Sequence, residues 1–286
     1  MTAVDSLREG NLGEALAQLQ DQIRKDPADV KLRIFLFQLL SVMGQWDRAL
    51  TQLNVSGEMD VSTLAMVQTY REALQCEVLR QEVFAGTKSP LIFGDPEQWI
   101  ALLLEAVKLS AQGEHGKAAE IRDQAFEMAP MTSGSVNGEP FEWIADADSR
   151  LGPILEAIVN GRYYWIPFYR IANVVVEEPG DLRDRVWMPA YFTWANGGQT
   201  VGLIPNRYPG SESSDDGQVA LGQKTDWLEV ADETFLGMGQ RMLATDAGEY
   251  GLMDIRTIDL DSEEEPSDQD AADQASGGQE TEGSDG

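Results

Sequence analysis

Residues 10–27, GNLGEALAQLQDQIRKDP, contain the spacing that decides the fold of the first half of the chain. A glycine opens this stretch, an alanine follows five residues later and a proline seventeen residues later. Both offsets recur in residues 113–130, GEHGKAAEIRDQAFEMAP, and the first recurs between Gly44 and Ala49. A glycine tolerates the left-handed turn that ends a helix, and a small alanine lets the following helix approach closely. The pattern therefore predicts helical hairpins.

The glycines also indicate a repeat. Gly10 and Gly44 are 34 residues apart, the period of tetratricopeptide (TPR) repeats, and Gly44 and Gly113 are 69 apart, close to two periods. The glycine expected near position 79 is absent, so we expect a TPR-like helical superhelix rather than a strict array. Three helix faces carry apolar residues every three or four positions: Leu12, Leu16, Leu19 and Ile23; Leu32, Phe35, Leu36 and Leu39; Trp46, Leu50 and Leu53.

Two further helices are expected before residue 130, where no strand pattern appears. One covers Leu64–Phe84, and another begins at Pro96 with Asp95 as its N-cap. The chain then changes character at residues 131–140, MTSGSVNGEP, a polar and glycine-rich break. This break predicts a domain boundary.

Beyond the break, apolar and aromatic segments predict strands over residues 163–168, 171–178, 187–194, 200–204, 227–230, 239–245 and 250–258. One helix is expected over residues 151–160, and Asn196–Gly198 is a strong hairpin signal. We therefore predict a two-domain α and β protein. Residues 1–135 form a TPR-like helical domain, and residues 136–258 form an α+β domain with a mainly antiparallel sheet.

The chain is strongly acidic. Its 286 residues include 49 Asp and Glu against 21 Lys and Arg, a net charge of −28, so we expect neither nucleic acid nor a membrane surface as a partner. Residues 259–286 carry 11 acidic residues and no Lys or Arg. They predict a disordered acidic tail that solubilises the chain or binds a basic partner. No apolar run long enough for a membrane span and no signal-peptide pattern is present, which predicts a cytoplasmic protein.

Few residues could carry catalysis or hold a metal. Cys76 is the single cysteine and His115 the single histidine, which excludes a disulfide framework and zinc sites with several such ligands. Asp146 and Asp148 in the motif DADSR could hold a divalent metal ion, which would make the chain a metal-dependent enzyme. Alternatively, Asp148 or Ser149 caps the predicted helix while Arg150 pairs with a carboxylate. Because no nucleotide-binding scaffold accompanies the pair, we predict no catalytic residue, no cofactor and no bound metal.

Two long blocks are the most specific features of the sequence: FEWIADADSRLGPILEAIVNGRYYWIPF at residues 141–168 and GQRMLATDAGEYGLMDIR at residues 239–256. Shorter blocks lie at residues 36–53, 70–90, 181–190, 203–212 and 224–227. Together they resemble the ImpE family, also called TagJ or SciE, over about residues 5–258. The resemblance implies a non-enzymatic accessory protein of the bacterial type VI secretion system. It also implies binding to an N-terminal helical segment of the small contractile-sheath subunit, and an indirect link to the ClpV-type AAA+ ATPase that recycles the sheath.

A superhelix of TPR-like hairpins leaves a concave groove in which an amphipathic helix can lie, and an acidic surface favours a helix that carries Lys or Arg. The candidate partner-binding residues line the middle helices: Phe37, Trp46, Glu77, Arg80, Phe84 and Trp99. The alternative for each is core packing, or a surface ion pair for Glu77 and Arg80. A generic TPR scaffold for another complex is a further alternative. The domain that holds the partner helix, the formation of a homo-oligomer, and the choice between sheath assembly, protection and disassembly stay open.

Overall fold

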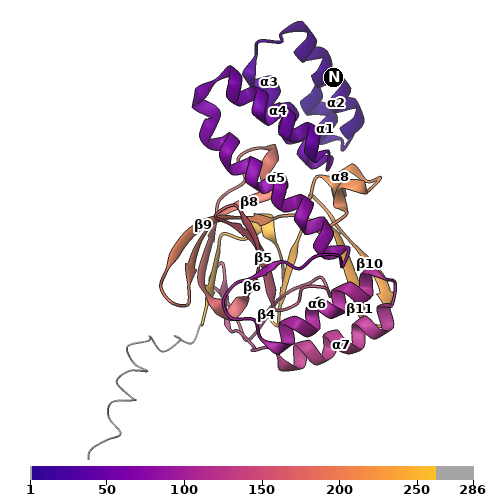
Figure 1. Ribbon diagram of the computed structural model, residues 1–286, viewed down its shortest axis with the longest axis vertical. Coiled ribbons are helices and arrows are strands. Elements are labelled where there is room, and N and C mark those ends of the chain that lie inside the picture. The colour runs from indigo at the N-terminus through magenta and orange to yellow at the C-terminus, as the bar shows by residue number, and fades with distance from the viewer. Residues whose placement is uncertain (1, 262–286) are drawn as a thin grey trace, which may run out of the picture.

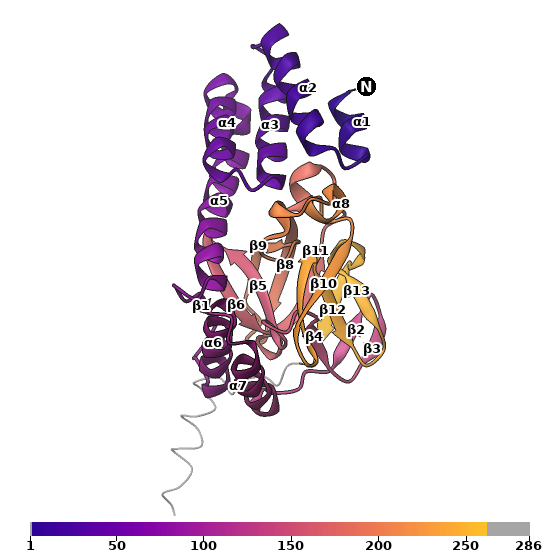
Figure 2. The same cartoon turned by 90° about the vertical axis from the view of Figure 1, so that its right-hand side faces the viewer.

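The computed structural model describes residues 2–261. Its helices up to residue 128 are α1 (Ala3–Arg8), α2 (Leu12–Lys25), α3 (Val30–Val42), α4 (Trp46–Met59), α5 (Leu64–Phe84), α6 (Gln98–Ala111) and α7 (His115–Met128). Figures 1 and 2 show α1–α4 side by side at one end of the molecule, while α6 and α7 pack as a pair near the other end. The long helix α5 runs from the first group down along the sheet and so connects the two parts (Figure 2).

The repeated glycines lie in the turns of the helical hairpins. Gly10, Gly44 and Gly113 separate α1 from α2, α3 from α4 and α6 from α7, with φ angles of 77°, 65° and 80°. These angles lie in the left-handed region, which glycine adopts at little cost. The alanine five residues after each glycine is buried in the next helix. Where the glycine near position 79 is missing, α5 continues unbroken for 21 residues. The TPR-like prediction is confirmed.

The rest of the described chain is mainly β-structure. The strands are β1 (Leu91–Ile92), β2 (Gly134–Val136), β3 (Glu139–Phe141), β4 (Ile144–Asp146), β5 (Ile154–Val159), β6 (Arg162–Pro167), β7 (Ile171–Val176), β8 (Trp187–Trp194), β9 (Gln199–Pro205), β10 (Thr225–Ala231), β11 (Thr234–Gly239), β12 (Met242–Thr245), β13 (Glu249–Gly251) and β14 (Thr257–Leu260). Short helical turns are η1 (Val61–Thr63), η2 (Phe168–Arg170), η3 (Leu182–Arg185), η4 (Ser211–Ser213), α8 (Gly217–Ala220) and η5 (Leu252–Asp254).

These strands form one large sheet and two small ones. The large sheet has nine strands in the order β1-β6-β5-β9-β8-β7-β14-β2-β3. Only the β1–β6 pairing is parallel within it, so the prediction of a mainly antiparallel sheet is confirmed for the described residues. Strands β10 and β11 form a hairpin, and β13, β12 and β4 form the remaining sheet.

The helix predicted over residues 151–160 is wrong. This segment contains β5, all six residues of which are buried, and it pairs with β6 through a tight turn. Asn160 and Gly161 occupy that turn with φ angles of 50° and 71°, as the favoured two-residue hairpin turns require. A strand covered on both faces reads as a nearly continuous apolar run, which has no period to distinguish it from a helix.

Other parts of the chain also differ from the prediction. Helix α6 begins at Gln98, two residues after the predicted start, with Glu97 as its N-cap. Strand β1 lies in the part predicted to have no strand, and the predicted strand over 250–258 is interrupted by η5. Strand β14 continues to Leu260 because it pairs with β7 and β2 on its two sides, so ordered structure extends past the predicted start of the acidic tail. The remainder of that predicted tail, residues 262–286, lies outside the described residues.

The large sheet separates two hydrophobic cores. One core joins apolar side chains of α1–α7 to Trp165, Trp187 and other residues on the helix-facing side of the sheet. The other lies on the opposite side and includes Phe168, Phe192 and Ile258. The first core crosses the predicted boundary between residues 135 and 136, so helices and sheet share one interior. Over residues 2–261, none of the helices has both the length and the apolar character that crossing a membrane requires.

Candidate functional site

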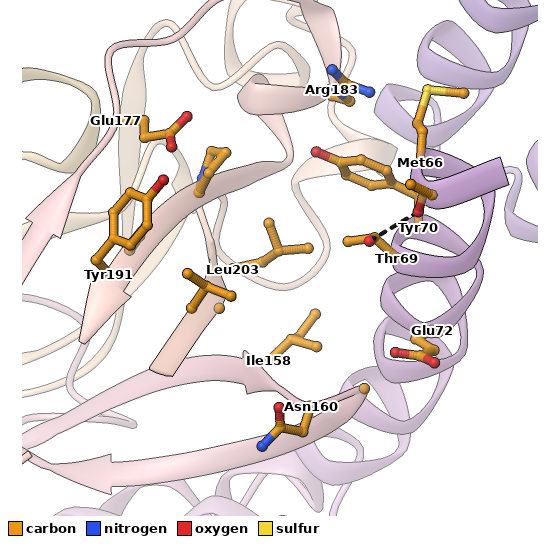
Figure 3. Close-up of a pocket in the computed structure, with 16 residues that line it drawn as sticks. Met66, Thr69, Tyr70, Glu72, Ile158, Asn160, Glu177, Arg183, Tyr191 and Leu203 are labelled. Carbon is orange, nitrogen blue, oxygen red and sulfur yellow. Dashed lines mark hydrogen bonds between the residues drawn. The ribbon is translucent and has the colours of Figure 1, made fainter. Parts of the chain in front are cut away.

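A cleft opens between α5 and the helix-facing side of the sheet (Figure 3). Its volume is about 550 Å³, and it is open to solvent. Its apolar lining includes Met66 and Tyr70 from α5, Ile158 from β5, Tyr191 from β8, and Val201 and Leu203 from β9. The two walls therefore come from segments far apart in the sequence, one helical and one β.

The floor of the cleft continues into an apolar row on the sheet, made of Val175, Tyr191 and Val201. These residues are direct cross-strand partners on β7, β8 and β9. They are 40%, 51% and 63% exposed, because α5 covers only the neighbouring part of this face. Successive strand residues point to opposite faces, so the neighbouring Val174 and Phe192 are buried in the second core. The row is thus an uncovered apolar strip beside the cleft.

Carboxylates stand at the edge of the cleft. Glu72 projects from α5 and Glu177 follows β7, as Figure 3 shows. The nearby Glu177 carboxylate raises the pKa of the Tyr191 hydroxyl. The cation at this edge, Arg183, is already paired with Asp181 at 2.8 Å. Neither Glu72 nor Glu177 has an ion-pair partner within residues 2–261, so both carboxylates remain available to a cation from outside.

Behind the cleft, a cluster of buried charges holds α5 to the sheet. Its buried members are Glu77, Arg80, Asp146, Asp148, Glu156, Arg207 and Arg241, and the partly buried Arg150 pairs with Asp148 at its margin. Glu156 lies at the centre, where it accepts hydrogen bonds from Arg80 Nε and Nη2 at 2.7 and 2.9 Å and further bonds from Arg241 and Tyr163. Arg80 Nη2 also donates to the Arg207 carbonyl at 2.8 Å. The cluster contains four carboxyl groups and four guanidinium groups, although the chain as a whole is strongly acidic.

The charges of the cluster shift the pKa values of its members in opposite directions. Burial opposes the charged form of Glu156, but Arg80 and Arg241 outweigh it and lower the pKa to about 2. Burial raises the pKa of Asp146 to about 7, and the nearby Asp148 adds to the rise.

Burial also raises the pKa of the Cys76 thiol, to about 12, so this buried cysteine is protonated at neutral pH and is a poor nucleophile.

The loss of folding stability at acidic pH provides a test of the environment of Glu156. The folded pKa of about 2 lies below the ordinary value of 4.5, so the unfolded chain binds the proton first as the pH falls. The stabilisation from Glu156 is therefore complete above pH 4.5 and is lost between about pH 4.5 and 2, by roughly 3 kcal/mol. We expect Glu156→Gln to remove most of this pH dependence in urea unfolding measured from pH 2 to 6. Equal slopes in both proteins would contradict the assignment.

The two aspartates of the DADSR motif are occupied by donors from the chain itself. Asp146 accepts hydrogen bonds from the Tyr208 hydroxyl at 3.0 Å and from Arg241. Asp148 accepts from Arg150 Nε at 2.9 Å and from the Gly237 amide at 2.8 Å. The predicted pairing of Arg150 with a carboxylate is confirmed, whereas the predicted helix cap is wrong because a strand, not a helix, follows. Within the described part of the chain, no group of three or more His, Cys, Asp or Glu is placed to hold a metal ion.

Three of the predicted partner-binding residues are buried aromatics of the helical half. Phe37 and Trp99 are fully buried, and Trp46 is 9% exposed. Phe37 packs against Tyr70 with ring centroids 5.8 Å apart, and Trp46 packs against Trp187 at 6.3 Å. These side chains therefore build the core between helices and sheet rather than an open groove.

The other three predicted residues face the sheet from α5. Glu77 accepts a hydrogen bond from Trp187 Nε1 at 2.9 Å, and Arg80 belongs to the buried cluster. Phe84 is half-buried and packs on Trp165 with ring centroids 6.0 Å apart. In this structure all six predicted side chains contact the chain's own interior. The four aromatic residues follow the core-packing alternative, whereas Glu77 and Arg80 form a buried ion pair rather than the surface pair of their alternative. A partner surface has to be sought among other residues.

The exposed row was not among the predicted contact residues. Val175, Tyr191 and Val201 each lie in a predicted strand, and alternation alone requires that one side of each strand faces away from the second core. That much could have been found from the sequence. Whether a helix covers this side depends on where α5 crosses the sheet, which the strand sequences do not encode.

Known proteins with similar sequence or structure place the chain in a family. The ImpE protein family matches residues 138–259, and a tetratricopeptide repeat family matches residues 6–69. The chain is 53% identical over 262 residues to the type VI secretion system accessory component TagJ of Pseudomonas aeruginosa, covering 91% of this chain and 92% of that protein. The fold is similar to the X-ray crystal structure of a Vibrio parahaemolyticus protein, with a TM-score of 0.83 and 25% identity over 91% of this chain and 98% of that one. The chain therefore belongs to the ImpE/TagJ family.

Proposed function

We propose that this chain is a non-enzymatic accessory protein of the type VI secretion system. The observation that carries the proposal is its 53% identity, over nearly the whole of both chains, to a protein described as an accessory component of that system. The helical hairpins support a role in protein–protein interaction, since TPR-like repeats build extended binding surfaces. The occupied DADSR carboxylates support the absence of metal-dependent chemistry at that motif.

In the finer form of the proposal, the chain acts in the cytoplasm and binds a helical segment at the N-terminus of the small contractile-sheath subunit. It is thereby linked to the sheath and, indirectly, to the ClpV-type ATPase. The net charge of −28 supports a partner segment that carries Lys or Arg, because opposite charges speed capture and favour the correct partner.

Titration of the full chain against a synthetic peptide tests this proposal. The peptide covers the N-terminal helical segment of the small sheath subunit from the same bacterium, and a scrambled peptide of equal composition is the control. We expect a Kd in the micromolar range, about −8 kcal/mol, measured by fluorescence anisotropy, with weaker binding as salt is added. Equal binding of both peptides, or no binding at about 100 μM, would reject the sheath segment as the partner.

A further inference from the structure

We infer that the partner segment docks in the cleft between α5 and the apolar row of Val175, Tyr191 and Val201, as a basic amphipathic helix. This inference rests on the proposed function and adds the place and chemistry of binding. Apolar side chains of the helix would enter the cleft beside Ile158 and Leu203, while a Lys or Arg would reach Glu72 or Glu177.

The first support is the continuity of apolar surface. Single exposed apolar residues are common on proteins, but contiguous patches mark interaction sites. Val175, Tyr191 and Val201 are adjacent across three strands, and the last two also line the cleft. A ligand that fills the cleft can therefore extend over the row, which suits a helix with anchors on successive turns better than a compact small molecule.

The second support is the rigidity of both walls. The floor is sheet, and the wall is α5, which the Arg80–Glu156 pair fixes to the sheet in the buried cluster. The hairpin turn at Gly161 lies close against α5, since a Cβ atom there would clash with the Glu72 carboxylate. A cleft whose walls are held before binding loses little entropy when its ligand enters.

The third support is charge, which selects among the occupants. A second copy of this chain would bring a net charge of −28 toward an edge that carries Glu72 and Glu177. The chain's own residues 259–286 contain 11 acidic residues and no Lys or Arg, so their charge also opposes this edge. A basic segment of another protein is attracted instead. The charges therefore favour a basic partner over self-association or the chain's own C-terminal segment.

Substitution in the row tests the docking site. Val201→Lys places a cation on an exposed position beside the cleft, and we expect it to weaken binding of the sheath-subunit peptide at least about 10-fold. Val61→Lys is the matched control, because Val61 is 78% exposed in η1, immediately before α5, and is not among the residues that line the cleft. It should bind within about twofold of the unchanged chain.

A second pair of variants separates docking from folding. Tyr191→Ala truncates a side chain that is 51% exposed. It should weaken binding of the peptide at least about fivefold while the melting temperature of the protein stays unchanged. Glu72→Gln combined with Glu177→Gln should reduce the salt dependence of binding. If the unchanged chain binds the peptide and folded Val201→Lys and Tyr191→Ala bind it equally well, the docking site is overturned and the proposed function stands. If the unchanged chain does not bind the peptide, the sheath proposal and this inference both fail.

Discussion

Methionine in place of Arg241 is expected to lower the free energy of unfolding by about 3–5 kcal/mol, the usual cost of removing one partner of a buried ion pair. Arg241 is fully buried and donates to the Pro205 carbonyl at 2.8 Å as well as to Asp146 and Glu156. Methionine fills much of the same space without the cation. Asp146 then loses its ion-pair partner. Its Oδ1 atom keeps the Tyr208 hydroxyl as a donor, but its Oδ2 atom is left without a donor in the interior, which is costly. Urea unfolding at pH 7, followed by circular dichroism, measures the loss.

The control for this prediction is an arginine in a surface pair. Arg24 pairs with Asp21, and their side chains are 72% and 59% exposed. Because exposed pairs contribute little, we expect Arg24→Met to change the free energy of unfolding by less than about 1 kcal/mol. If Arg241→Met had a similarly small effect, and the slope of the unfolding free energy against urea concentration were unchanged, water would have to reach the buried cluster.

Alanine in place of Trp187 is expected to lower the free energy of unfolding by about 3–5 kcal/mol, as for other large core aromatics. Trp187 starts β8, is fully buried, and contacts Trp46 and Tyr70 with ring centroids 6.3 and 5.6 Å apart. Its truncation therefore leaves a cavity where helices and sheet meet. Thermal unfolding and urea unfolding measure the loss, and a single transition for both halves would confirm that they share this core.

Two further variants divide the contribution of Trp187. Trp187→Phe keeps an aromatic ring but removes the Nε1 donor to Glu77, so we expect a loss of about 1–3 kcal/mol from the unsatisfied buried carboxylate. Trp227→Ala is the control for the removal of a tryptophan in general. Because Trp227 is 39% exposed, its replacement should lower the free energy of unfolding less than Trp187→Ala does. If Trp187→Ala were no worse than Trp227→Ala, the junction would not depend on this side chain.

Local signals predicted much of the architecture correctly. Gly10 and Gly44 marked turns because a left-handed φ angle favours glycine wherever it occurs, without help from distant residues. Strand β8 was predicted with its observed limits, since its buried and more exposed positions largely alternate. Strand β5 was missed for the opposite reason, because burial on both sides of the sheet erased the alternation.

The candidate site was much less accessible from the sequence. Glu77 and Arg80 lie on a middle helix, where an amphipathic pattern predicts a distinct face but does not predict which segment covers that face. In the structure that face of α5 contacts Trp187 and Glu156 of the sheet. The pair of Glu77 and Arg80, which could have been exposed at the surface, is therefore buried. The exposed Val201 shows the converse, an apolar strand residue that no helix reaches.

The amino-acid sequence by itself determined the helical hairpins, the antiparallel strands and the strongly acidic character of the chain, because turn conformation, periodicity and charge are properties of neighbouring residues. The tertiary structure alone decided which faces are covered. The path of α5 across the sheet covers the buried pair of Arg80 and Glu156 and leaves the apolar row of Val175, Tyr191 and Val201 uncovered. Coverage depends on contacts between segments about a hundred residues apart, and no local pattern contains that information.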